Sequence, residues 1–422
     1  MTLVAVFMLF VVGAMAALSI DVVTVYTARS EAQLTADAAA LAAARVIANS
    51  GATTDTTGTL LTNVETATGP ATTVAAQVAE QNQVGGAYLT SGEITVSFGG
   101  TNLPTNPTVT VSVQITNLPT FFARIWGAKF ITVGATATAE AYNPSGANAA
   151  TGTTTPVAPV CVKPWLLPNI DPTNSPNAIF VTATGAIAPT AGNLLGYTTP
   201  PIPGSTRLKL ACGAPATAYS ANCTAPLPPP LAWQYYPGDP ASFPPPTQAL
   251  PACTPALNPG YQESVAGCIQ TPIACNSQVN IDQPAYLTRN SETAEAVNCM
   301  NHATNNKGDT VTSTNPPTTP FEFVAGDDNP VAGLAGKDVM VSDSLVTVPV
   351  FDSSAGVPVP ANPVTIIGFV QLFLAPQGLA TPASGHMRST VINMAGCGTG
   401  ASGTPILGNG ASPVAVRLIS PP

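Results

Sequence analysis

The chain has 422 residues, a length that allows two or three domains and a sizeable hydrophobic core. Only 8% of the residues are charged and 45% are hydrophobic, which excludes the composition of an intrinsically disordered protein. The net charge is -9, and the basic residues are scattered singly rather than gathered in a patch. We therefore expect no nucleic-acid partner.

An uncharged apolar run extends from Leu3 to Ile20. As a helix rising about 1.5 Å per residue, this run nearly spans a hydrocarbon core of about 30 Å. Asp21 follows it, and a charge at this depth is costly unless it is paired or reaches the interface. Asp21 therefore marks either the membrane interface or a contact with another membrane subunit. Tyr26 is placed as an interfacial aromatic residue.

A cleaved signal peptide is the competing interpretation, because Ala14-Met15-Ala16 offers an A-x-A cleavage site. However, no Lys or Arg precedes the apolar run, and the helical pattern continues past this site without a break. We therefore expect an uncleaved, single-pass transmembrane helix. The missing basic segment favours a natural start codon further upstream.

Residues 26 to 50 contain no Gly or Pro and are rich in Ala, so they predict an extension of this helix as a rigid stalk. Ala38, Ala39, Ala42 and Ala43 lie close together on the surface of such a helix. Small side chains there would let a second helix approach closely. Helix propensity alone explains the same alanines equally well.

Residues 17 to 44 read ALSIDVVTVYTARSEAQLTADAAALAAA. This segment resembles the N-terminal signature of TadG-like proteins of Flp (tight-adherence, Tad) pilus assembly. The resemblance implies a bacterial inner-membrane protein whose periplasmic or extracellular body helps to assemble or anchor a Tad-type pilus or a related secretion machine. It also implies that other pilus-assembly subunits contact the N-terminal helix. The matching positions, which are the candidates for membrane or partner-helix contact, are Asp21, Tyr26, Arg29, Asp37, Ala38, Ala39 and Ala42, together with Gln33.

Two features of that family are not found in this sequence. Many members carry a von Willebrand A domain with a metal-binding D-x-S-x-S motif, and the nearest match here, residues 352–356, lacks the final Ser. No prepilin cleavage site precedes the apolar run. We therefore expect no metal site and no processing by a prepilin peptidase. The Asx-rich segment at residues 326–329 is interpreted as a turn rather than a calcium site.

The body after the stalk predicts an α+β fold. Residues 51–73 have the composition of a loop, and residues 74–83 predict a short helix. Alternating apolar and polar residues predict strands at 93–98, 109–115 and 131–142, with a short helix or turn at 121–127. We assign residues 51–145 to one small, pilin-like α+β module, similar to the domain that follows the helix in TadE- and TadG-like proteins.

A linker at residues 146–160 leads to a second module, residues 161–422, which we expect to be β-rich. Strands are predicted at 346–351, 364–374 and 389–394, the second of them central in its sheet. The Pro-rich stretch 226–251 predicts polyproline II and turns rather than sheet.

All the cysteines of the chain lie in this module, and their number is even. This distribution favours disulfides and therefore an exported body. The shortest loops would join Cys212 to Cys223 and Cys268 to Cys275. The disulfide candidates are Cys161, Cys212, Cys223, Cys253, Cys268, Cys275, Cys299 and Cys397.

No catalytic constellation is recognisable. His302 and His386 are the only histidines, and no nucleophile elbow accompanies them. The G-x-G-x-x-G pattern at residues 398–403 is followed by a proline instead of a helix. We expect no enzyme activity, cofactor or small-molecule substrate. If Trp233, Tyr235 and Tyr236 were exposed they would favour a membrane-tethered adhesin or envelope-binding protein, the alternative to a pilus-assembly component; packing against their own prolines is the simpler expectation.

Overall fold

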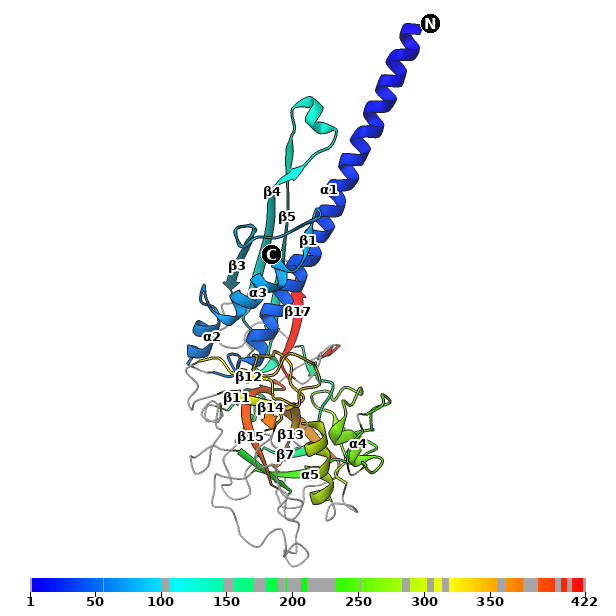
Figure 1. Ribbon diagram of the computed structural model, residues 1–422. Helices are drawn as coiled ribbons and strands as arrows, with labels where there is room; N and C mark the ends of the chain where they lie inside the picture. The colour runs from blue at the N-terminus through cyan, green and yellow to red at the C-terminus, as the bar shows by residue number, and fades with distance from the viewer. Residues whose placement is uncertain are drawn as a thin grey trace, which may run out of the picture.

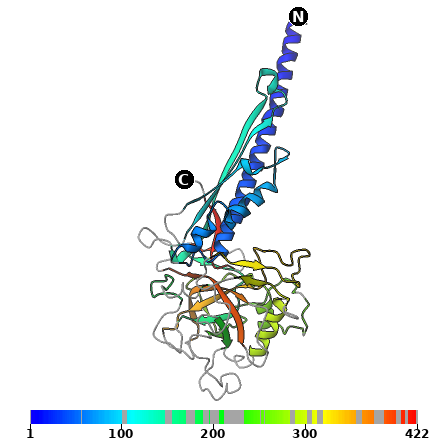
Figure 2. The ribbon, with the colours of Figure 1, turned by 60° about the vertical axis from the view of Figure 1, so that its left-hand side comes forward.

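The computed structural model of the chain is a long rod with a rounded head (Figure 1). The N-terminus lies at the free end of the rod, and the head lies at the opposite end (Figure 2). The structure describes residues 2–55, 57–99, 106–146, 155–169, 180–188, 195, 206–210, 233–250, 252–254, 256–282, 289–301, 307–312, 319–354, 362–374, 386–398, 404–407 and 412–419.

One helix, α1 (Thr2–Asn49), forms the axis of the rod and confirms that the apolar run and the stalk are continuous. Its N-terminal end projects past the tip of the β4–β5 hairpin and beyond the rest of the protein (Figure 1). Its C-terminal half buries a face that consists mostly of alanine. The buried alanines recur every three or four residues, which places them on one side of the helix, as at Ala28, Ala32, Ala36, Ala39 and Ala43.

A four-stranded antiparallel sheet covers this alanine face in the order β17-β5-β4-β3. Alternate residues of β4, such as Val109, Val111 and Val113, are buried, as expected for a strand with one face on a core. The β4–β5 turn contains a short 3-10 helix, η2. The elements are β3 (Ile94–Gly99), β4 (Thr108–Pro119), η2 (Ala123–Trp126), β5 (Phe130–Tyr142) and β17 (Ala415–Ile419).

These elements confirm the strands and the turn expected between residues 93 and 142. The return of β17 to this sheet was not expected, because it lies more than 250 residues after β5 (Ala415 pairs with Tyr142). The division into modules at residues 50, 145 and 160 stays a prediction, as does the likeness of the first module to a pilin.

Two helices and two small hairpin strands complete the rod. The prediction of a loop at residues 51–73 is wrong where α2 and the start of α3 lie. Helix α2 forms because Leu60, Leu61 and Val64 bury an apolar face. Helix α3 begins at Pro70, a position where the missing N–H of proline costs no hydrogen bond. The elements are α2 (Thr59–Val64), α3 (Pro70–Glu80), β1 (Gln83–Val84), β2 (Ala87–Tyr88) and the 3-10 helix η1 (Ser91–Glu93).

The head contains a closed ring of six strands, β14-β13-β7-β9-β8-β15, since β15 pairs with β14 as well as with β8. These strands confirm the β-rich content expected after residue 161 and the central place of β14, which β13 and β15 flank. The ring and its added strand are β7 (Trp165–Pro168), β8 (Thr206–Leu210), β9 (Trp233–Pro237), β10 (Gln278–Val279), β13 (Leu345–Phe351), β14 (Val364–Leu374) and β15 (His386–Gly396).

Smaller elements surround the ring. They are the 3-10 helix η3 (Pro144–Gly146), β6 (Val157–Ala158), α4 (Tyr261–Ala266), α5 (Arg289–Met300), β11 (Thr310–Thr312), β12 (Glu322–Val324) and β16 (Ile406–Leu407).

The prediction that residues 226–251 form no sheet is wrong, because β9, which lies within them, pairs with β7 and β8 in the ring. Its aromatic residues drive this burial. Tyr235 is fully buried, with its ring 6.0 Å from that of Trp165, and its hydroxyl donates to Thr293 at 3.0 Å. Tyr236 packs edge-on against Phe351. Neither tyrosine is available for sugar or peptide binding.

Three disulfides are present among the described residues. The expected Cys268–Cys275 bridge is wrong, because the two cysteines bond to distant partners that the fold brings close. The Cys212–Cys223 expectation lies outside the described residues. The bridges are Cys161–Cys268, Cys253–Cys299 and Cys275–Cys397.

Candidate membrane anchor and its attachment to the body

The N-terminal half of α1 exposes large apolar side chains on all sides. Phe7, Leu9, Phe10 and Met15 are each more than 60% exposed. A contiguous apolar surface of this size is unfavourable in water. The helix is long and apolar enough to cross a membrane, which is consistent with membrane anchoring.

Asp21 directly follows the uncharged apolar run, and it is only 6% exposed. Its carboxylate accepts hydrogen bonds from three consecutive backbone amides of the β4–β5 turn. The amide of Phe121 donates to Oδ1 at 2.8 Å, and those of Phe122 and Ala123 donate to Oδ2 at 3.0 and 2.6 Å. A carboxylate that binds several amides is well compensated for the loss of water. The structure therefore pairs Asp21 within its own chain, a role that sequence analysis missed.

A second carboxylate attaches another turn to α1. The amide of Gly85, between β1 and β2, donates to Glu31 Oε2 at 2.7 Å. Gly85 has a φ of 62°, a conformation that glycine adopts without a steric cost. Asp21 and Glu31 are ten residues apart, which corresponds to about 15 Å along the helix. The two turns are thus held at two separate heights on the rod.

The other predicted contact residues divide between two faces of α1. Tyr26 is 77% exposed, and Arg29 and Ala38 are exposed as well. Ala39 is buried in the core of the rod, so a partner helix has no access to it.

Asp37 and Ala42 are partly buried, and Asp37 accepts a hydrogen bond from the Gln33 side-chain amide at 2.8 Å. A second helix does pack along α1, but it is α3 of the same chain, with buried Ala71, Ala75 and Ala79.

A buried polar network joins the rod to the head. Asn393 of β15 donates from Nδ2 to the carbonyl of Ala48, at the end of α1, at 2.6 Å. Its Oδ1 accepts from the hydroxyl groups of Thr53 and Thr54. The amide of Met394 in turn donates to Thr54 Oγ1 at 2.8 Å. Buried networks of this kind fix one relative arrangement of the parts that they connect.

The edge strand β17 is attached to β5 by one side chain in particular. The guanidinium of Arg417 lies 2.8 Å from Glu140 and stands over the ring of Tyr142, 4.7 Å from its centroid. The Tyr142 hydroxyl donates to the carbonyl of Thr155 at 2.8 Å. Strands β5 and β17 are therefore linked at the end of the rod that adjoins the head.

The head has one fully desolvated lysine. Lys163 donates from Nζ to the carbonyls of Val265 and Gly267 at 2.6 and 2.8 Å. Burial lowers the pKa of Lys163 to about 7, and the negative charge of Asp343 opposes this shift. The lysine ties the segment after Cys161 to the end of α4, which is a structural role.

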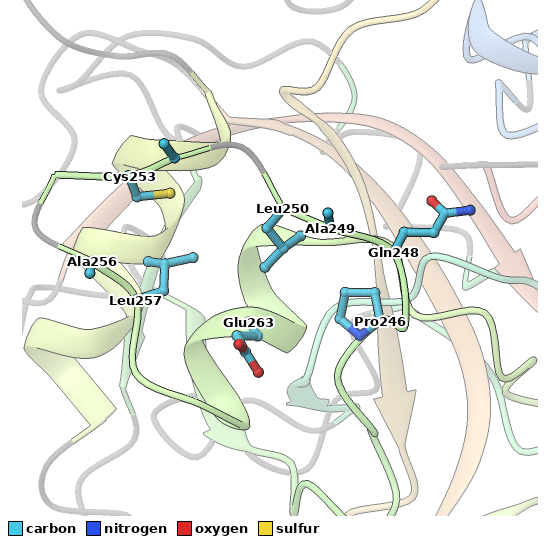
Figure 3. Close-up of a pocket in the computed structure, with 9 residues that line it drawn as sticks. Pro246, Gln248, Ala249, Leu250, Cys253, Ala256, Leu257 and Glu263 are labelled. Carbon is cyan, nitrogen blue, oxygen red and sulfur yellow. The ribbon is translucent and has the colours of Figure 1, made fainter.

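A pocket of about 430 Å³ lies beside α4 in the head (Figure 3). Its described lining is largely apolar, with Leu250 and Leu257 opposite each other, and Glu263 is the carboxylate among these residues. Glu263 Oε2 accepts from the amide of Gly260 at 3.1 Å, so it caps the start of α4. These lining residues offer no acid–base pair.

The remaining candidates for chemistry have structural partners or lie outside the described residues. Asp309 accepts hydrogen bonds from Gly326, Asn329 and Ser342, and no cluster of metal-ligating side chains occurs among the residues that the structure describes. His302 lies outside those residues, and His386 begins β15.

Comparisons with known proteins agree with the N-terminal resemblance. Residues 1–46 match the family model Tad, described as putative Flp pilus-assembly TadE/G-like. No curated protein and no solved structure matches the chain. The matched residues are almost the whole of α1, so the resemblance inferred from residues 17–44 is confirmed for the anchor and the stalk.

Proposed function

We propose that the chain is a non-catalytic, membrane-anchored structural or assembly component of a Tad-type (Flp) pilus. The observation that carries the proposal is the coincidence of the matched family segment with α1. This helix has one bare apolar half and one half packed into the body. The bare half anchors the protein in the inner membrane, and the packed half holds the head at a fixed distance from it.

The disulfides support a location of the body outside the cytoplasm. Three bridges between described cysteines brace the head, and such bonds form and persist outside the cytoplasm. The rod and head therefore extend into the periplasm or beyond, where the exposed face of α1, with Arg29 and Ala38, is accessible to other pilus-assembly subunits.

Two experiments test the proposal. In the first, spheroplasts carrying a C-terminally tagged chain are extracted with alkali and treated with external protease. We expect the chain to remain in the membrane and to lose its tag. Release of the intact chain by alkali would contradict the anchor, and a tag that resists protease would contradict the orientation.

The second experiment deletes the gene in the natural host and complements it. We expect surface pili to be lost on deletion and restored by the full chain. The control replaces residues 3–20 with an unrelated single-pass anchor, which separates a need for membrane attachment from a need for the native helix. Normal pili in the deletion strain, with reduced attachment to surfaces, would instead indicate a tethered adhesin.

A further inference from the structure

We propose that the tip of the β4–β5 hairpin, residues 119–131, is a second membrane contact that inserts into the anionic lipid surface beside the anchor. The inference rests on the membrane anchoring proposed above. It adds a lipid-binding site formed by the body of the protein rather than by the helix.

The first argument is the exposed apolar surface of the hairpin tip. Phe121, Ile125 and Phe130 are 61%, 73% and 60% exposed. They gather within one turn, at a point where nothing else in the described structure covers them. Large apolar side chains on a projecting turn are stabilised when they enter the boundary between lipid headgroups and acyl chains.

The second argument is the position of the tip. The hydrogen bonds that the amides of residues 121–123 donate to Asp21 hold the tip beside the base of the bare apolar segment. Both views show the tip standing next to α1, with the helix continuing beyond it (Figure 1 and Figure 2). When the bare segment spans a bilayer, the tip is placed at the bilayer surface.

The third argument is charge. Arg124 and Lys129 are both exposed on the tip. No acidic residue occurs between Glu93 and Glu140, although the chain as a whole carries a net charge of -9. An apolar turn flanked by basic side chains matches an anionic phospholipid surface, which attracts the cations while the apolar groups insert. Asp21 contacts the tip as well, but this residue is only 6% exposed, so the exposed charges of the tip are the two cations. A protein partner would leave these two exposed cations without an evident role.

The test uses a tryptophan probe in the full chain, reconstituted into vesicles. Trp126 is first replaced by Phe, and the probe Ile125→Trp is then introduced at the most exposed of the three apolar residues named above. The matched control carries Tyr88→Trp instead, at a residue that is 63% exposed in the β1–β2 hairpin. That hairpin is bound to Glu31, about 15 Å further from the membrane along the helix. The vesicles contain phosphatidylglycerol and phosphatidylethanolamine, with lipids brominated in the upper acyl chain as quenchers.

We expect brominated lipid to quench the Ile125→Trp probe and to leave the Tyr88→Trp probe unaffected. Adding Arg124→Gln or Lys129→Gln should weaken the partition of the tip into the anionic surface by about fivefold each. Vesicles of phosphatidylcholine alone should give the same weak quenching with and without these substitutions.

Three results would overturn the proposal. If the chain floats with the vesicles but the Ile125→Trp probe is not quenched, the hairpin contact is wrong and the anchor stands. If the chain does not float at all, both the anchor and the hairpin contact are wrong. If brominated lipid quenches the Ile125→Trp probe only when the other pilus-assembly subunits are added to the vesicles, the tip binds protein and does not bind lipid by itself.

Discussion

Replacement of Asp21 by Ala tests how the β4–β5 hairpin is held against the helix. The substitution removes three hydrogen bonds, from the amides of Phe121, Phe122 and Ala123, while leaving the apolar run before it intact. The amides lie on a projecting turn, so water can solvate them once the turn moves away. We therefore assign each bond the ordinary net value of about 1 kcal/mol rather than the larger value for a desolvated charge.

The sum is about 3 kcal/mol, which corresponds to an increase of about 100-fold in the population of the detached hairpin. Asp21→Asn keeps one side-chain oxygen and places an NH2 group near the remaining amide. Its effect should therefore lie between those of the wild type and the Ala variant, at about tenfold.

Hydrogen–deuterium exchange in lipid nanodiscs measures this detachment directly. Peptides covering residues 119–131 should exchange faster in Asp21→Ala, while peptides covering residues 83–88 should not change. Glu31→Ala is the matched control, and it should show the reverse pattern because it frees only the amide of Gly85. Unchanged protection of residues 119–131 in Asp21→Ala would refute the reasoning, as would equal loss of protection in both variants.

Three further predictions concern the head. Because the pKa of Lys163 is lowered to about 7, the unfolded chain binds more protons above pH 7, and the free energy of unfolding should rise between about pH 7 and 9 by up to about 1.4 kcal/mol per pH unit. Urea titrations at both pH values should show this rise in the wild type and lose it in Lys163→Met. Asn393→Ala should lower the free energy of unfolding by about 3 kcal/mol, since it removes the hydrogen bonds that Asn393 makes with Ala48, Thr53 and Thr54; a fall as small as that of a surface substitution would contradict a role for the network. Non-reducing peptide maps should contain the Cys275–Cys397 bridge, which closes a loop of 122 residues, and reduction should destabilise the head by about 4–5 kcal/mol.

The sequence predicted the elements whose signals are local. The apolar run and the Ala-rich segment predicted α1, and strict alternation predicted β4 and β5, because helix and strand periods depend on neighbouring residues. The aromatic residues of β9 were a signal for a buried strand, but the surrounding prolines led to a prediction of polyproline II for this segment.

The attachments between elements could not be predicted in the same way. The amides that bind Asp21 are 100 to 102 residues away in the sequence, and β17 pairs with a strand even further away. The Cys268–Cys275 expectation failed for the same reason, since short separation in the sequence lowers the entropy of loop closure but does not place the two sulfur atoms together. One usable signal was the cost of an unpaired Asp21, which required a partner somewhere.

The pairing of β17 with β5 has a mechanical consequence. The chain enters the head after β5 and leaves it before β17, and these adjacent strands run in opposite directions along the rod. A force applied to the head along the rod axis therefore pulls β5 and β17 lengthwise past β4 and α1. Ladder hydrogen bonds perpendicular to the pull must then rupture together, as in shear, whereas a pull across the sheet would unzip them one at a time. The sheet of the rod therefore lies in the orientation that best resists traction along the rod axis.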